Sequence, residues 1–230
     1  MDSKVVLRSK KNKRSKKIEK MIRITLLVLF LVLVLLYFVF RIIYNSGNFT
    51  ITLDRNLGLE KGIIIYDNPN YKEYQSKILV ESPDRFDNIS SKWLPGDLDE
   101  YVGSHNGDNY LAYSFYVENT GVDTSDYWAE IVVDDVIKGV DEAIRLRVYQ
   151  NGKPVTFAKL ATNGRPEPGT TPFESDTLVT TYHVSSFTPG QVDKYTIVLW
   201  LEGSDPECND NILGGEIQLH MQFNSEFVGK

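Results

Sequence analysis

The longest feature of the hydrophobic pattern is an unbroken apolar run near the N-terminus. From Ile24 to Phe40 the sequence reads ITLLVLFLVLVLLYFVF, in which Thr25 is the one polar residue. Extended to residues 21–44, the run reaches the roughly 20 residues that a helix needs to cross a bilayer core. It lacks the polar face that a helix at the surface of a soluble domain would carry. The pattern therefore predicts a transmembrane helix over residues 21–44, with the lipid bilayer as its partner.

After residue 44 the pattern changes to short runs in which apolar and polar residues alternate. In residues 109–121, Leu111, Tyr113 and Phe115 fall on one face of a strand, because side chains alternate across a strand with period two. The same criterion, with β-branched residues and flanking turns, predicts further strands. They cover residues 48–53, 62–68, 76–80, 127–135, 143–149, 155–159, 177–184, 194–203 and 215–223.

The connections between these runs define the fold class. The dipeptide Asn151-Gly152 separates two of the predicted strands and is the clearest hairpin signal in the chain. One short helix is expected, around Asp135–Glu142. About 185 residues follow the membrane run, which is enough for one hydrophobic core. Many short strands with one wet face predict an all-β fold, an antiparallel β-sandwich of jelly-roll or Ig-like type, over residues 45–230.

Charge is distributed unevenly along the chain and indicates its orientation. The first 23 residues hold ten Lys/Arg against Asp2 and Glu19, a net charge of +8. Because the whole chain has a net charge of −6, the remaining residues carry −14. An excess of Lys/Arg marks the cytoplasmic side of a membrane span. We therefore expect a basic cytoplasmic tail over residues 1–20, an extracellular domain over residues 45–230, and a single-pass type II protein in the cell membrane. The orienting residues are Lys16, Lys17, Lys20, Arg23 and Arg41.

Two further expectations concern the two ends of the apolar run. The segment that follows it, RIIYNSGNFT, has no A-x-A cleavage pattern and offers only Ser46 and Gly47 as small residues. The long run and this flank favour a retained signal anchor over a cleaved signal peptide. Next to such an anchor, the basic tail is an orientation signal and a contact for anionic lipids, so a nucleic-acid partner is not expected.

Residues that carry enzymatic chemistry are sparse. His105, His183 and His220 are scattered, and the sequence contains no H-E-x-x-H, no G-x-S-x-G and no glycine-rich phosphate loop. The single cysteine, Cys208, has no internal disulfide partner, and its acidic neighbours should keep the thiol protonated. An intermolecular disulfide through Cys208 stays open. We therefore expect neither an enzyme nor an organic cofactor.

The stretch EGSDPECNDN, residues 202–211, is the strongest candidate for ligand binding. Its four carboxylates are oxygen ligands of the kind that Ca²⁺ prefers, although the spacing is not that of an EF-hand loop. The favoured interpretation is a solvated connector between two strands, with a Ca²⁺ site as the alternative. The tentative metal ligands are Glu202, Asp205, Glu207 and Asp210.

A second binding option rests on aromatic residues. Trp93, Trp128 and Tyr149, if exposed, offer flat faces on which sugar rings stack, although such aromatics more often fill a core. The alternative function is therefore a surface module that binds Ca²⁺ or carbohydrate.

Several phrases outside the membrane run carry a family resemblance. They are RIIYNSGNFTITLDRNLGLEKGI, WLPGDLDE, GSHNGDNYLAYSFYVENTG, VIKGVDEAIRLRVYQNGK and VLWLEGSDPECNDNILGGEIQLHM. Together they resemble a group of small single-pass surface proteins of Gram-positive bacteria (clostridia and bacilli), in which the acidic loop around Cys208 is a family feature. The phrase LPGD followed by YSFYVENTG is similar, more distantly, to the TasA and camelysin group of matrix-fibre proteins. That likeness implies a jelly-roll-like sandwich and assembly by passing a strand between subunits, although fibre subunits are released by cleavage.

These observations favour a membrane-anchored extracellular β-sandwich with a non-enzymatic structural or protein-interaction role at the bacterial cell surface. The partner is an unidentified protein or the cell wall, and self-assembly is open. Strand addition is one mode, with NFTITL as the exchanged or edge strand; the alternative is that this strand pairs within its own sheet.

Overall fold

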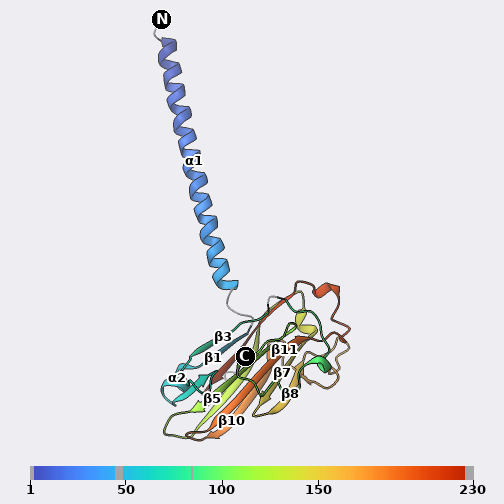
Figure 1. Ribbon diagram of the computed structural model, residues 1–230. Helices are drawn as coiled ribbons and strands as arrows, with labels where there is room; N and C mark the ends of the chain where they lie inside the picture. Colours follow the sequence, from blue (N-terminus) through green and yellow to red (C-terminus); the bar gives the residue numbers. More distant parts are fainter. Residues whose placement is uncertain (1–2, 45–48, 84, 226–230) are drawn as a thin grey trace. The chain divides into compact units, whose positions relative to one another are not determined.

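The computed structural model describes residues 3–44, 49–83 and 85–225, which divide into an N-terminal helical unit and a β-rich unit from Gly47 onward. Figure 1 shows the elements. The helices are α1 (Ser3–Tyr44) and α2 (Arg55–Leu59), with 3₁₀ turns η1 (Ser91–Trp93), η2 (Val140–Glu142) and η3 (Asp210–Ile212). The strands are β1 (Phe49–Leu53), β2 (Ile63–Tyr66), β3 (Lys77–Val80), β4 (Gly103–Ser104), β5 (Tyr110–Asn119), β6 (Ser125–Ile137), β7 (Ile144–Gln150), β8 (Lys153–Ala158), β9 (Thr171–Pro172), β10 (Leu178–Phe187), β11 (Val192–Leu201) and β12 (Glu216–Asn224).

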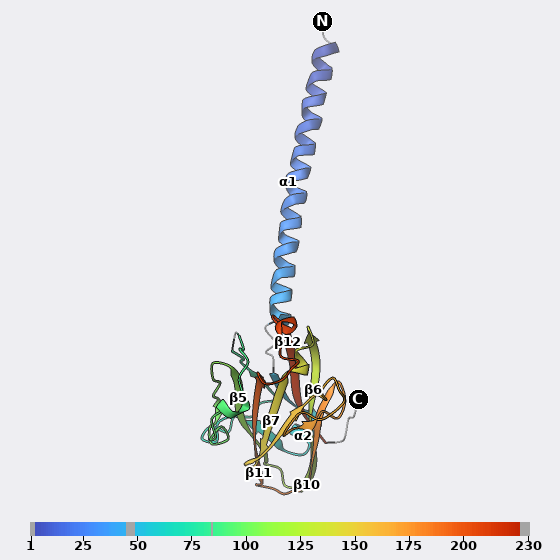
Figure 2. The same cartoon turned by 90° about the vertical axis from the view of Figure 1, so that its right-hand side faces the viewer.

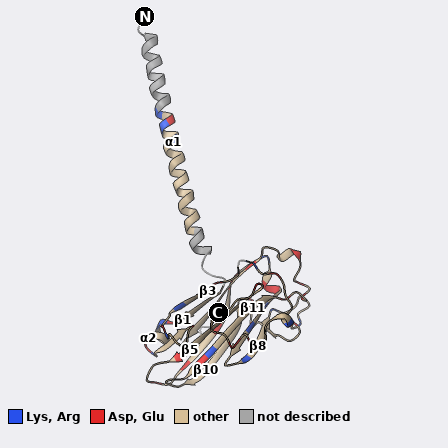
Figure 3. Ribbon diagram, viewed as in Figure 1, with Lys and Arg blue, Asp and Glu red and all other residues tan. Residues whose placement is uncertain are grey.

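α1 is one continuous helix of 42 residues, so no break separates the basic tail from the apolar run. A segment long and apolar enough to cross a membrane extends from Lys17 to Val39, with a mean hydropathy of 2.9, and its apolar part is tan in Figure 3. Such a helix is able to serve as a membrane anchor or as a signal sequence. Within it, Arg23 pairs with Glu19 at 2.5 Å, one turn earlier. The side chains of Lys16 and Arg41 lie outside the described residues.

The β-rich unit is a sandwich of two sheets, which confirms the predicted fold class behind one N-terminal helix (Figures 1 and 2). Sheet A has the order β10-β6-β12-β1-β3, and sheet B has the order β2-β5-β11-β7-β8-β9, with β4 also paired to β5. Most neighbouring strands are antiparallel, as expected. Two pairs differ, because β1 runs parallel to β12 and β8 runs parallel to β9.

The inward faces of the two sheets form the main core. The residues predicted to share one face of β5, Leu111, Tyr113, Phe115 and Val117, all belong to it, whereas residues of the opposite face, such as Ala112 and Ser114, are buried outside this core. Phe115 stacks on Tyr195 of β11 and meets the edge of Phe223 of β12, with ring centroids 5.6 and 5.8 Å apart. Each such aromatic ring contributes about 1.5–3 kcal/mol through burial, so contacts of this kind between the sheets dominate the stability of the sandwich.

β1, the strand directly after the membrane run, is an internal strand and not an edge. It pairs in parallel with β12, Phe49 opposite Leu219, and in antiparallel register with β3, Phe49 opposite Val80. Phe49 and Ile51 have no exposed surface. Residues 49–53 therefore pair within their own sheet, which confirms that alternative over the option of an exchanged or edge strand.

Local turn chemistry was predicted correctly at the hairpin and wrongly at the expected helix. Asn151 and Gly152 have φ angles of 50° and 78°, as a type I′ turn requires. Around Asp135–Glu142 there is no α-helix: β6 continues to Ile137, opposite Glu216 of β12, and only a 3₁₀ turn follows. The ladder bonds to β12 outweigh the local helical preference there.

A second, smaller apolar cluster covers the outward face of sheet B. Ile89 and Leu98, from the long connection between β3 and β4, pack with Tyr149, Val198 and Trp200. Because of this cover, Tyr149 is only 7% exposed, so it is unavailable as a stacking platform for sugars.

The Asn-x-Gly sequence at the end of β5 has a structural explanation. Asn119 is fully buried, and its amide donates to the carbonyls of Phe187 (2.8 Å) and Asp123 (2.9 Å) while its oxygen accepts from the Gly121 N–H (2.9 Å). A Cβ at Gly121 would lie 2.2 Å from the carbonyl oxygen of Lys61. The motif thus joins the end of β5 to three other segments of chain.

Replacing this amide by an isosteric carboxylate tests that role. We expect Asn119→Asp to lower the free energy of unfolding by about 2–4 kcal/mol at pH 7, because two buried carbonyls lose their donors and face a charge. Urea denaturation of the full-length chain in detergent measures this. Asn163→Asp is the matched control, since exposed Asn163 only accepts a bond from the Arg165 N–H. Equal stabilities of the two variants would contradict the assignment.

Candidate functional site

The outward face of β7 carries a guanidinium that two loops bury. Neighbouring Ile144 and Leu146 point into the main core, so Arg145 points away from it, yet Arg145 is only 3% exposed. Its Nη2 lies 3.1 Å from Glu167 Oε2 and also pairs with Asp205 Oδ2. Its Nη1 donates to the carbonyl of Ile144 at 3.1 Å. Because a buried charge requires a partner, these bonds hold both loops against sheet B.

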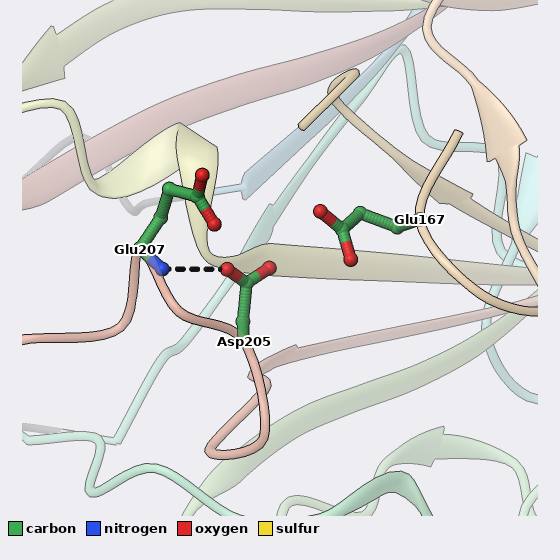
Figure 4. Close-up of side chains that lie close together, drawn as sticks. All are labelled: Glu167, Asp205 and Glu207. Atoms are coloured by element: carbon green, nitrogen blue, oxygen red, sulfur yellow. Dashed lines mark hydrogen bonds between the residues drawn. The ribbon is translucent and has the colours of Figure 1, made fainter. Parts of the chain in front are cut away.

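Three carboxylates gather around this guanidinium. Glu167, Asp205 and Glu207 each offer an oxygen that lies within 4.8 Å of the other two, and Figure 4 shows the side chains arriving from two separate loops. Asp205 Oδ1 accepts from the Glu207 N–H at 2.8 Å. Glu207 Oε1 accepts from the Thr162 hydroxyl at 2.7 Å. We call Arg145, Glu167, Asp205 and Glu207 the Arg145 cluster.

The charges of the Arg145 cluster do not balance when every group is ionised. Three carboxylates face one guanidinium, and Glu207 Oε2 is buried with no hydrogen-bond partner among the described residues. Burial raises the pKa of Asp205, and its contact with Glu207 adds to that rise against the effect of Arg145. The same contact with Asp205, together with Thr162, lowers the pKa of Glu207 to about 2. Asp205 and Glu207 therefore titrate as a pair, in which Asp205 takes up the proton first.

The cluster meets only part of what a calcium site needs. Its oxygens are ligands of the right type, but Ca²⁺ takes about six to eight of them, and the described residues bring three carboxylates together. Arg145 occupies part of the same space as a competing cation. The cluster therefore acts mainly as a structural ion-pair network that holds the acidic loop against sheet B, and a negative charge remains at Glu207.

The four predicted ligands do not form one group. Asp205 and Glu207 meet, but Asp210 is exposed at the start of η3. Glu202 is buried separately and accepts bonds from Trp200 Nε1 (3.1 Å), the Ser91 N–H (3.0 Å) and the Ser204 hydroxyl (2.7 Å). Burial opposes ionisation of Glu202, but these bonds outweigh it and lower its pKa. The favoured interpretation as a connector needs one correction, because two of its acids are buried and bonded and only part of it is solvated.

Glu167 was not among the predicted ligands. It lies in a loop rich in Gly, Pro and Thr, far from residues 202–211 in sequence, and no local spacing connects the two. Its burial beside Arg145 depends on how the loop folds back over β7, which no sequence pattern indicates. An acidic residue that is 8% exposed in such a loop becomes recognisable only in the structure.

Cys208 is half-buried beside this loop. Burial, together with the charge of Asp205, raises the pKa of its thiol. At neutral pH the side chain is therefore a protonated thiol, which is a weak nucleophile and a weak metal ligand.

The remaining candidate residues are dispersed. Trp93 is 75% exposed on η1, whereas Trp128 is half-buried on β6 and stacks on His183, with ring centroids 4.2 Å apart. The histidines have separate partners: His183 contacts Asp126, His220 contacts Asp134, and His105 Nδ1 lies 2.9 Å from the Gly103 carbonyl oxygen. In the described ranges, the one group with metal-ligand spacing contains no histidine.

No protein-family model and no curated protein matches the chain. Among solved structures, it is similar to two crystal structures of a beta-glucosidase from Kluyveromyces marxianus. The complex with glucose is 14% identical with a TM-score of 0.26, over 72% of this chain and 15% of that chain. The selenomethionine-labelled enzyme is 13% identical with a TM-score of 0.23, over 69% and 16%. The match spans only a small part of that enzyme, and scores this low support no conclusion about function.

Removing the guanidinium tests the Arg145 cluster. We expect Arg145→Met to lower the free energy of unfolding by about 3–5 kcal/mol at pH 7, because it leaves buried carboxylates without a cation. Burial already raises the pKa of Asp205 against the effect of Arg145, so in the variant this pKa should lie still further above its unfolded value. The loss should therefore shrink as the pH falls toward about 4, because Asp205 is then protonated in the folded state. Urea denaturation across this pH range measures both effects.

Arg147→Met is the control, since Arg147 is the next outward residue of β7. It is only half-buried, bonds the Thr156 hydroxyl at 3.0 Å and lies over the Trp200 ring. Arg147→Met should lower the free energy of unfolding by less than Arg145→Met does, and the decrease should be nearly independent of pH. A pH-independent loss in Arg145→Met would show that the side chain acts through packing alone.

Proposed function

We propose that the chain is a single-pass type II protein of the bacterial cell membrane, whose β-sandwich lies outside the cell and has a non-enzymatic structural or interaction role. The main support for this proposal is that an apolar helix long enough to cross a membrane is followed closely in sequence by the first strand of the sandwich. The apolar segment Lys17–Val39 lies in α1, which ends at Tyr44, and the sandwich begins with β1 at Phe49. An apolar segment of this length suffices for anchoring.

The position of β1 supports a tether that bears load. Force applied through the anchor reaches the domain at Phe49, which is the first residue of a strand paired on both sides. Its backbone bonds to β12 and β3 would have to break together before the strand could leave, which is more resistant than a strand paired on one side. This arrangement suits a protein that holds a partner at the surface, and strand exchange between copies would require one β1 to replace another.

The orientation is supported by the Lys/Arg excess before the span. Residues 1–23 carry a balance of +8, and such segments remain in the cytoplasm. The folded domain carries the compensating negative charge, which keeps it soluble on the other side of the membrane.

Labelling of single cysteines in intact bacterial cells tests the topology. In a Cys208→Ser background, we expect Asn163→Cys to react with a membrane-impermeant maleimide, because Asn163 is exposed in the sandwich. The matched variant Ser9→Cys should react only after lysis, because residue 9 precedes the span. Reversed labelling, or labelling of both variants only after lysis, would refute the proposed location.

A second candidate function, calcium binding, is favoured by one observation. Glu207 Oε2 is buried with no described partner, beside two further carboxylates. A divalent cation there would balance the charge that Arg145 leaves, with Glu207, Asp205 and Glu167 as its protein ligands.

Thermal unfolding of the full-length chain in detergent tests whether a bound cation, or a proton shared by Asp205 and Glu207, balances the charge of the cluster. If the cluster binds Ca²⁺, saturating Ca²⁺ after EDTA should stabilise the fold, by about 2.7 kcal/mol at a hundredfold excess over Kd. Glu207→Gln should abolish the shift, and Asp210→Asn, an exposed acid of the same loop, should retain it. If Ca²⁺ does not change the melting temperature of the unmutated protein, the cluster has only a structural role.

A further inference from the structure

The outward face of sheet A places six polar or aromatic side chains in two adjacent rows. Because Tyr127, Ala129 and Ile131 of β6 point into the core, Trp128 and Glu130 point outward. The register sets Trp128 between Asn224 of β12 and His183 of β10, and Glu130 between Gln222 of β12 and Thr181 of β10. We call these residues the Trp128 face. They are Trp128, Glu130, Thr181, His183, Gln222 and Asn224.

Two atoms of the Trp128 face are buried without partners. Glu130 is 2% exposed, and its Oε2 accepts from Gln222 Nε2 at 2.6 Å, but its Oε1 bonds to no described residue. Asn224 Nδ2 is likewise buried and without a described partner. An unmade bond at such a group costs about 1–3 kcal/mol, so native proteins retain few of them.

Two other outward carboxylates of β6, Asp126 and Asp134, have partners, so among these three the unpaired oxygen is particular to Glu130. Asp126 accepts from the Ser186 N–H at 2.8 Å and contacts His183 at 3.4 Å, and Asp134 contacts His220 at 2.8 Å. Glu130 lies between them on the same strand, is the most buried of the three, and yet keeps one oxygen bare.

We propose that the Trp128 face binds a neutral glycan. A bare carboxylate oxygen accepts only, and a bare amide nitrogen donates only, so a complementary ligand must offer both a donor and an acceptor. Glu130 repels anions, and the N–H groups of Asn224 disfavour cations. Hydroxyl groups of a sugar donate and accept without net charge. Asn224 and Glu130 are diagonal neighbours on paired strands, about 7–8 Å apart at their backbones, a span that adjacent hydroxyls of one sugar ring bridge.

The indole gives this site an apolar wall. His183 stacks on one side of Trp128 with an interplanar angle of 12°, which leaves the outer edge and the opposite side of the half-buried ring for a ligand. The C–H face of a sugar packs against that side while its hydroxyls reach Asn224 and Glu130. Gln222 is half-buried and bonds Glu130 Oε2, so a rotamer change at Gln222, of the kind common on binding, would let a ligand approach the Glu130 carboxylate. Glycan binding specifies the ligand of the proposed interaction role. It rests on the proposed function only in one respect, that the domain must lie outside the cell to meet external glycans.

Titration of the full-length chain in nanodiscs of uncharged lipid tests the proposal. The probes are the hexaoses of four neutral glycans: cellulose, starch, chitin and β-mannan. We expect saturable binding of at least one, with a Kd between about 10 μM and 1 mM, by calorimetry and tryptophan fluorescence. The absence of saturable binding of all four at about 10 mM would overturn the proposal, whatever the topology labelling gives.

Variants separate a binding role of the bare atoms from a structural one. Glu130→Gln should weaken binding about tenfold or more while leaving the melting temperature unchanged or higher, because it removes a buried unpaired charge. Glu216→Gln, an exposed outward acid of β12, should change neither quantity, and Trp93→Ala should retain binding. Undiminished affinity in Glu130→Gln, or loss of binding in Trp93→Ala alone, would place the sugar elsewhere and overturn the assignment.

Discussion

The pairing of β1 with β12 and β3 is the constraint on which the rest of the sandwich depends. It joins the first strand after α1 to β12, and without it β3 has no neighbour in sheet A. Phe49 and Ile51 are fully buried through this pairing, so it also completes the main core. Closing a loop of this length carries an entropic cost that only the combined burial and ladder bonds offset.

Polar groups inside the domain serve three different ends. Asn119 satisfies carbonyls where segments meet, and Glu202 collects donors at the end of β11. Arg145 compensates the acids of two loops and so brings them against sheet B. In these cases the bonds are made within the chain. Glu207 Oε2, Glu130 Oε1 and Asn224 Nδ2 are buried atoms without a described partner, and we assign the last two, on the Trp128 face, to a ligand.

The proposed surface role does not require a catalytic group. In that proposal the apolar segment Lys17–Val39 holds the domain near the membrane, the doubly paired β1 resists removal, and the outward face of sheet A serves for contact. Neither the acidic loop nor the scattered histidines alter that interpretation, because the former is held by Arg145 and the latter have partners of their own.

The sequence by itself determined what depends on local pattern. The apolar run, the alternating strands and the turn at Asn151-Gly152 were predicted correctly, because hydrophobic length, period two and positive φ are properties of neighbouring residues. The helix expected near Asp135 failed because pairing with β12 overrode local preference. Only the tertiary structure decided the parallel pairing of β1, the meeting of Glu167 with Asp205 at Arg145, and the bare oxygen of Glu130. Each of these depends on residues distant in sequence, whose contact is set by the register and packing of whole sheets.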